Sequence, residues 1–227
     1  RRHHLPRTSH PLLGVRQQDA EDERSFRWEI LADTDSVPSL ALCQRDLGTR
    51  LPASLCTELI LAAAADLGSG KPNEIEIEDF TLSGPGSPTS APADSRFAIQ
   101  VKATVSSAHR GKLQIFVPPR TENDQPWQRA ATATFHLAPV PEASGSAPEG
   151  GGLEAVRLRC PREIGLDWPR AILERHGAAF PRGLDSLRSL HLGNNEFLAR
   201  LEIPPGCQND VGHFHLHPVM IEMGVAL

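Results

Sequence analysis

The chain has 227 residues, enough for one large domain or for two domains of roughly 100 residues each. Its residues are 22% charged and 39% hydrophobic, which excludes wholesale disorder. The net charge of -5 argues against a general nucleic-acid binder, because such a protein needs a basic surface. The longest apolar run, residues 59–65, is far shorter than the ~18–20 residues that cross a bilayer, so we expect no membrane partner. Tyrosine is absent.

Alternating apolar residues predict strands through most of the first half of the chain. The predicted strands cover residues 26–30, 74–82, 97–105, 113–117 and 131–137. In the second of them the alternation changes phase at residues 78–79, which predicts a β-bulge.

One helix is predicted among these strands. Ser54 is its expected cap, residues 55–67 form it, and Gly68 ends it. Its apolar side chains cover most of the circumference, so the helix needs cover on several sides. Long antiparallel strands around one such helix describe an α+β hot-dog arrangement.

The second half of the chain begins to repeat this order. Two stretches rich in Pro, Gly and Ser interrupt the pattern: residues 83–95 predict a loop, and residues 140–152 predict a domain linker. After the linker we predict a short helix at 169–176, strands at 187–192, 197–203 and 213–217, and a helix that begins at Pro218. We therefore expect an N-terminal hot-dog at 1–139 and a C-terminal hot-dog at 153–227 that is incomplete at its C-terminal end.

The cysteines and the two ends of the chain bear on its compartment and context. Cys43, Cys56, Cys160 and Cys207 form no CxxC pair, whereas zinc sites and disulfide-rich frameworks have closer spacing. We therefore expect free thiols in a reducing cytoplasm. The chain does not begin with Met and ends at 224–227 within a predicted helix, so we expect a piece of a longer polypeptide.

Several segments, in order from residue 10 to residue 222, resemble the dehydratase domain of modular type I polyketide synthases. The segments are His10–Gly14 (HPLLG), Pro52–Leu59 (like PGxAYLEL), Trp127–Arg129 (like WxxH), Leu158–Ile164 (like RCPxEI), Gly183–Leu187 (like GLxSL), Phe197–Pro204 (like xLAxxxLP) and Phe214–Pro218 (FxLHP). No single match is specific, but the ordered set is. The resemblance implies a double hot-dog fold.

The resemblance also implies a reaction and partners. That family removes water from a 3-hydroxyacyl chain carried on the phosphopantetheine of an acyl carrier protein. A histidine takes the proton next to the thioester carbonyl, and a protonated carboxyl group donates a proton to the departing hydroxyl. The implied partners are the acyl carrier protein, neighbouring synthase domains in the same chain and a second copy in a homodimer. The resemblance implies no cofactor and no metal.

The positions of the two catalytic groups differ from the family pattern. Counting back from Pro52 in the HxxxGxxxxP motif places Leu47 at the glycine and Cys43 at the histidine. Allowing one deletion recovers Gly48 as the glycine but places Gln44 at the base. No histidine occurs between His10 and His109, so no register supplies one.

The acid and the tunnel segment are altered as well. In HPxxxD the acid position is Glu222, and Ala226 stands where the family has a partner residue four positions later. The YGPxF segment is shortened, with Phe180 near the tyrosine position. The resemblance places the substrate tunnel at Leu47, Gly48, Pro52, Phe180, Pro181, His217 and Pro218. The missing tyrosines fit this picture, because Cys56 and Phe180 stand near two family tyrosines.

Structural interpretations compete with functional ones. For Cys43 a small buried side chain is favoured over a nucleophile, because no histidine can be placed beside it. Glu222 is equally compatible with an acid role and with a carboxylate near a helix start. His213, His215 and His217 would share one face of a strand, but we interpret their spacing as coincidental rather than as a metal site.

Three hypotheses follow for function. The first is a degenerate dehydratase domain that serves as a dimerising structural element. The second is a slow dehydratase, isomerase or cyclase that uses Glu222. The third is a module that binds acyl carrier protein without turnover.

Overall fold

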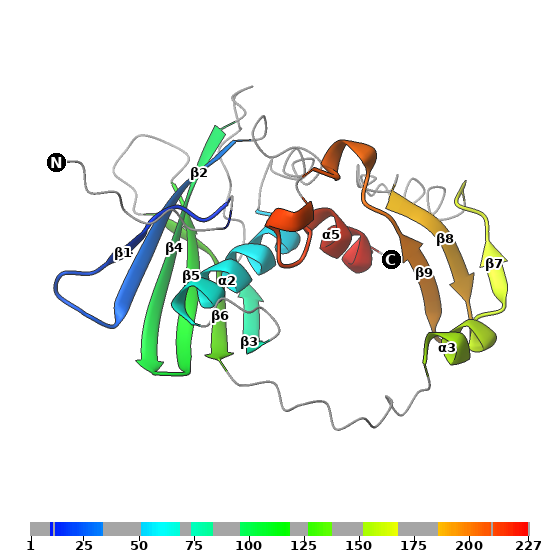
Figure 1. Cartoon of the computed structure of the whole chain (residues 1–227), viewed down its shortest axis with the longest axis horizontal. Helices are drawn as coiled ribbons and strands as arrows, with labels where there is room; N and C mark the ends of the chain where they lie inside the picture. The colour runs from blue at the N-terminus through cyan, green and yellow to red at the C-terminus, as the bar shows by residue number, and fades with distance from the viewer. Residues whose placement is uncertain are drawn as a thin grey trace.

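The computed structural model describes residues 10, 12–33, 51–68, 74–83, 96–118, 127–137, 152–167, 186–209 and 211–226 (Figure 1). In the first half, the described strands form one antiparallel sheet of order β1-β2-β4-β5-β6-β3. The strands are β1 (Arg16–Gln18), β2 (Ser25–Asp33), β3 (Ile75–Leu82), β4 (Arg96–Ser107), β5 (Arg110–Val117) and β6 (Gln128–Leu137). All five strands predicted for this half are therefore confirmed.

The phase change in β3 is a β-bulge, as predicted. The pairing of β3 with β6 shifts register between Glu78 and Thr81. Asp79 lies inside this shift with a φ of 51°, the left-handed conformation that an extra residue in a strand can require. The bulge returns Leu82 to pairing with Ala131 on β6.

Helix α2 (Ala53–Leu67) lies against one face of the sheet and contacts β3, β4, β5 and β6 (Figure 1). Every residue from Leu55 to Ala65 except Thr57 is buried, as expected for a helix that is apolar all round. Its large side chains belong to the same core as Trp28, Ile99, Leu113, Ile115 and Phe135 of the sheet. Fully burying one leucine or isoleucine contributes roughly 1.5–3 kcal/mol, so this contact dominates the stability of the first hot-dog.

The sequence predicts the C-terminal end of α2 correctly and its N-terminal end wrongly. Gly68 ends the helix and donates its N–H to the carbonyls of Ala64 and Ala65. Ser54 as the cap is wrong, because the capping position is Pro52 and no side chain caps this helix. Pro52 has φ -55° and ψ 141°, and its carbonyl accepts the N–H of Cys56, so the helix starts two residues earlier than predicted.

The second half has a smaller antiparallel sheet and a second apolar helix. Its described elements are α3 (Leu153–Arg159), β7 (Arg162–Ile164), β8 (Leu187–Leu192), β9 (Phe197–Leu201), the 3-10 turns η4 (Pro205–Cys207) and η5 (Val211–His213), and α5 (Pro218–Ala226). The sheet order is β7-β8-β9. Helix α5 contacts α2, so the apolar helices of the two halves lie side by side (Figure 1).

Two predicted strands of the second half, β8 and β9, and the helix at Pro218 are confirmed. The strand predicted at 213–217 is wrong: residues 211–213 form η5, and residues 214–217 have no regular structure. The cause is that His215 and Leu216 donate their N–H groups to a side chain of α2 and not to another strand.

Several predicted segments fall outside the described residues. They are the loop at 84–95, the helix at 169–176 and the linker at 140–152 apart from its last residue. Among the described helices, none is long and apolar enough to cross a membrane.

Candidate functional site

The predicted site residues are only partly within the described residues. Cys43, Leu47, Gly48, Phe180 and Pro181 lie outside them. The described ones lie near the starts of the two apolar helices. Pro52 precedes α2, and His217 precedes α5. Pro218 is the first residue of α5, and Glu222 lies further along α5. Pro52, His217 and Pro218 are buried.

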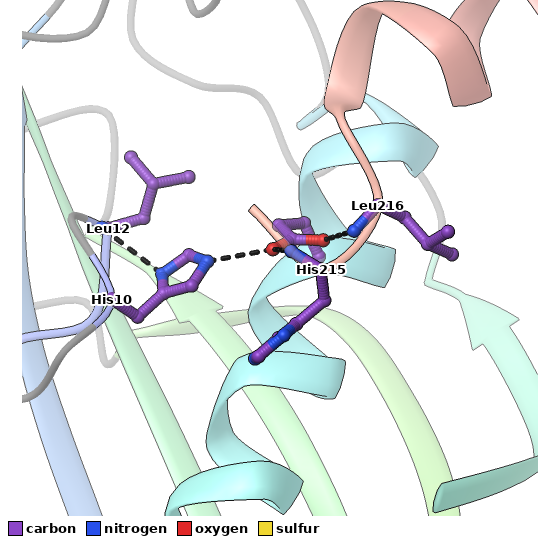
Figure 2. A network of polar contacts seen from close by, with 5 residues as sticks. His10, Leu12, His215 and Leu216 are labelled. Atoms are coloured by element: carbon purple, nitrogen blue, oxygen red, sulfur yellow. Dashed lines mark hydrogen bonds and ion pairs between the residues drawn. The ribbon is translucent and has the colours of Figure 1, made fainter. Parts of the chain in front are cut away.

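A buried carboxylate joins these two regions. Glu58 lies in the second turn of α2, and its side chain is fully buried. Its Oε1 accepts the Nε2–H of His10 at 2.7 Å and the backbone N–H of His215 at 2.7 Å. Its Oε2 accepts the backbone N–H of Leu216 at 2.8 Å. In Figure 2, His10 and Leu216 lie on opposite sides of this carboxylate, and we call His10, Glu58, His215 and Leu216 the Glu58 clasp.

The hydrogen bonds of the clasp determine its protonation state. The Nδ1 of His10 accepts the N–H of Leu12 at 3.2 Å, so Nδ1 carries no proton (Figure 2). His10 is therefore neutral and carries its proton on Nε2, which donates to Glu58. Glu58 faces three N–H donors, the arrangement that suits an ionised carboxylate. The clasp is a buried carboxylate held by three neutral N–H groups, and no lysine or arginine within the described residues takes part.

Aromatic rings enclose the clasp. The ring of His215 stacks on that of His10, with centroids 5.5 Å apart. The ring of Phe214 meets the ring of His10 edge-on at 5.8 Å and that of His217 at 5.2 Å. Phe214 also packs against the core of the first hot-dog. This cover keeps water from the carboxylate and strengthens its hydrogen bonds.

His215 is the clasp residue whose pKa is clearly perturbed. Burial lowers the pKa of its imidazole, and the charge on Glu58 opposes this effect. His215 is therefore neutral at pH 7. Its contribution to the clasp is the backbone N–H, while its ring covers His10.

The clasp is saturated with hydrogen bonds and does no acid–base chemistry as it stands. Both ring nitrogens of His10 are engaged, so this histidine cannot take a proton from a substrate without giving up a bond. Both oxygens of Glu58 accept hydrogen bonds while fully buried. What this arrangement does is hold the segment before α5 against α2.

The cysteines of the described residues are inert. Cys56, Cys160 and Cys207 are free and buried, so the prediction of free thiols is confirmed for these three. Burial raises the pKa of the Cys56 thiol to about 12, which excludes a thiolate at neutral pH. In the described part of the chain, no group of three His, Cys, Asp or Glu side chains is placed to hold a metal ion.

Two cavities lined by described residues lie away from the clasp. One of about 480 Å³ lies over β1, β2, β4 and β5, and includes Arg27 and Lys102. Another of about 600 Å³ lies between α3 and the second sheet, beside Cys160 and His191. The acyl tunnel predicted at Leu47, Pro52 and Phe180 therefore stays a prediction.

Sequence reasoning missed the role of Glu58. The signal was present: Glu58 is the only charged residue from Pro52 to Ala65, in a helix whose neighbours are apolar all round. A lone carboxylate in such a helix must find donors, because burying it without them is costly. In the sequence, His10 belongs to the HPLLG segment, and His215 belongs to the FxLHP segment and to the row of alternating histidines.

Comparison with known proteins agrees with this architecture. The family model for the polyketide synthase dehydratase N-terminal domain matches residues 148–223. Polyketide synthase GfsB of Streptomyces halstedii is 26% identical over 226 residues, which are 96% of this chain and 4% of that protein. The chain thus spans only a small part of that relative.

Solved structures share the fold at low sequence identity. The dehydratase domain from the CurF module of curacin polyketide synthase is 16% identical, with a TM-score of 0.75 over 96% of this chain and 74% of that one. The dehydratase domain of a mycocerosic acid synthase-like polyketide synthase is 17% identical, with a TM-score of 0.71 over 96% and 70%. The double hot-dog fold and the resemblance to polyketide synthase dehydratase domains are therefore confirmed.

Proposed function

We propose that this polyketide synthase dehydratase-like domain is a structural, dimerising element of its module, with dehydration of 3-hydroxyacyl chains strongly reduced. The observation that carries the proposal is the absence of histidine between His10 and His109, so that neither Cys43 nor Gln44, the two residues that the motif count places at the family's base position, is a histidine. Dehydration forms a double bond between C2 and C3 as a base takes the C2 proton and an acid protonates the departing C3 hydroxyl, which leaves as water. Losing the general base lowers such a rate by about 10²–10⁴-fold.

The two histidines of the Glu58 clasp do not replace the missing base. His10 is engaged at both ring nitrogens, and the ring of His215 is stacked on it. A thiol of ordinary pKa, ~8.5, is mostly protonated at neutral pH, so Cys43 is a poor substitute. Glu222 keeps a carboxyl group at the acid position, but an acid without a base leaves the reaction incomplete.

The partners follow from the family and from the surface. We propose docking of an acyl carrier protein with its phosphopantetheine-linked chain, neighbouring synthase domains in cis, and a cytoplasmic location. A homodimer is supported by apolar side chains at a sheet edge. Phe80 and Leu82 on the edge strand β3, and Trp127 just before β6, are each 39% exposed. An edge strand of this kind favours cover by another chain.

The direct test is turnover of a 3-hydroxyacyl chain on a carrier protein, followed as loss of water by intact-protein mass spectrometry. The wild-type domain is expected to give little enoyl product. Cys43→His combined with Glu222→Asp restores the family's two groups and is expected to raise the rate by about 10²-fold or more.

The other hypotheses predict different outcomes. Wild-type conversion at a useful rate, abolished by Glu222→Gln but not by Cys43→Ala, would replace the proposal with an active enzyme. Tight binding of acyl carrier protein without turnover, by a domain that stays monomeric in size-exclusion chromatography with light scattering, would replace it with a binding module.

A further inference from the structure

We infer that Glu58 is a positioning residue: its buried carboxylate fixes the start of α5 relative to α2, and thereby the backbone position of residue 222. The inference rests on the proposed function in one respect: that proposal makes Glu222 the residue at the acid position, so its placement matters. Its physical basis is that the Glu58 side chain on α2 accepts hydrogen bonds from two consecutive backbone N–H groups just before α5.

The two backbone bonds define an orientation as well as a distance. The N–H of His215 reaches Oε1 at 2.7 Å and that of Leu216 reaches Oε2 at 2.8 Å. Because consecutive N–H groups go to different oxygens of one planar carboxylate, the segment cannot rotate about a single bond as it could with one contact. The carboxylate thus sets the direction in which the chain leaves Leu216.

Little freedom separates this contact from α5. His217 alone stands between Leu216 and Pro218, where the helix begins. The ring of Pro218 fixes its own φ, and the carbonyl of His217 accepts the N–H groups of Met220 and Ile221. His217, Pro218 and Val219 are buried. A displacement at Leu216 is therefore passed to the first turn of α5.

The charge explains why the contact is specific. Glu58 is ionised and fully buried, and its three donors are neutral, so each hydrogen bond is charge-assisted. Separating this segment from Glu58 would leave the N–H groups of His215 and Leu216 without their acceptor and the buried carboxylate without two of its donors. Ordinary apolar contact between α2 and α5 has no such penalty for sliding. Phe214, packed in the first core, anchors the segment on its other side.

The chain offers a matched control. Glu78 on β3 accepts a hydrogen bond from Nε2 of His136 on β6 at 3.0 Å, which repeats the His–Glu pair of the clasp on the sheet surface. The Glu78 side chain is 46% exposed and that of Glu58 is 0% exposed. Glu78→Gln thus changes the same chemical group without touching α5.

The test is amide NMR of the full chain, with hydrogen exchange, for wild type, Glu58→Gln and Glu78→Gln. In wild type the amide protons of His215 and Leu216 are expected far downfield and slow to exchange. Glu58→Gln is expected to move them upfield, speed their exchange roughly tenfold or more and shift the α5 amides, including that of residue 222. Glu78→Gln is expected to leave all of these unchanged.

Two results would overturn the inference. One is ordinary shifts and fast exchange for the two amides in wild type, which needs no variant and so stands even if Glu58→Gln does not fold. The other is a folded Glu58→Gln variant with unchanged α5 amides. Neither measurement involves turnover, so failure here is distinct from failure of the proposed function.

Discussion

Removing His10 is predicted to destabilise the protein far more than removing His136, its partly exposed counterpart on the sheet surface. In His10→Ala the buried carboxylate of Glu58 loses a charge-assisted hydrogen bond worth about 1.5–3 kcal/mol. The buried N–H of Leu12 also loses its acceptor, which costs about 1 kcal/mol or more. We expect a loss of about 3 kcal/mol in the free energy of unfolding. His136→Ala breaks a pair exposed to solvent and is expected to cost roughly 0–1 kcal/mol.

A third variant separates the two hydrogen bonds of His10. His10→Gln can place an amide N–H near the position of Nε2, so it can keep the bond to Glu58 while the acceptor for Leu12 is lost. We expect it to cost about 1–2 kcal/mol, between wild type and His10→Ala. Urea unfolding curves measure all three variants, with midpoints that shift and slopes that stay constant. The reasoning is refuted if His10→Ala is no more destabilising than His136→Ala, or if His10→Gln is as damaging as His10→Ala.

Three further predictions concern other parts of the molecule. Gly14→Ala is expected to cost about 1–3 kcal/mol in urea unfolding, because a Cβ there would overlap the carbonyl oxygen of Glu29, whereas Gly212→Ala meets nothing and is expected to be neutral. The Cys56 thiol, with a pKa of about 12, is expected to resist iodoacetamide at about pH 8 until the protein is unfolded, as peptide mass mapping would show. Burial lowers the pKa of His215, so the imidazole binds a proton more readily in the unfolded chain than in the folded one. The contribution of His215 to the free energy of unfolding is therefore full above about pH 6.5 and decreases as the pH falls below it. His215→Gln is expected to reduce this decrease, measured as urea midpoints across the pH range.

The sequence predicts the first hot-dog well because its signals are local. A half-buried strand must alternate, so β2, β4, β5 and β6 are visible in the residue order, and the phase change in β3 marks its bulge. The helix end at Gly68 is equally local. There the N–H reaches back into the helix, and a Cβ would lie 2.8 Å from Leu137 Cδ1.

The errors arise where distant residues decide local structure. Residues 213–217 alternate like a strand, yet the N–H groups of His215 and Leu216 bind Glu58, more than 150 residues earlier in the chain. Ser54 is a good capping residue by type, but the helix begins before it and its buried hydroxyl has no hydrogen-bond partner among the described residues. The residue pattern alone shows neither which N–H groups bind Glu58 nor how their arrangement stabilises its carboxylate.

The motif residues of this chain thus fall into two groups, one expected to act on stability and the other on turnover. His10, Glu58 and the FxLHP segment match the family and form a saturated clasp, whose hydrogen bonds act on stability and on the placement of α5. The motif count places Cys43 and Glu222 at the positions of the two proton-transfer groups, and we propose that these positions differ from the family. Because the clasp has no free acid or base, stability should follow His10 and Glu58, and turnover should follow positions 43 and 222. A variant that restores histidine at position 43 should therefore gain turnover while the amides of His215 and Leu216 remain protected.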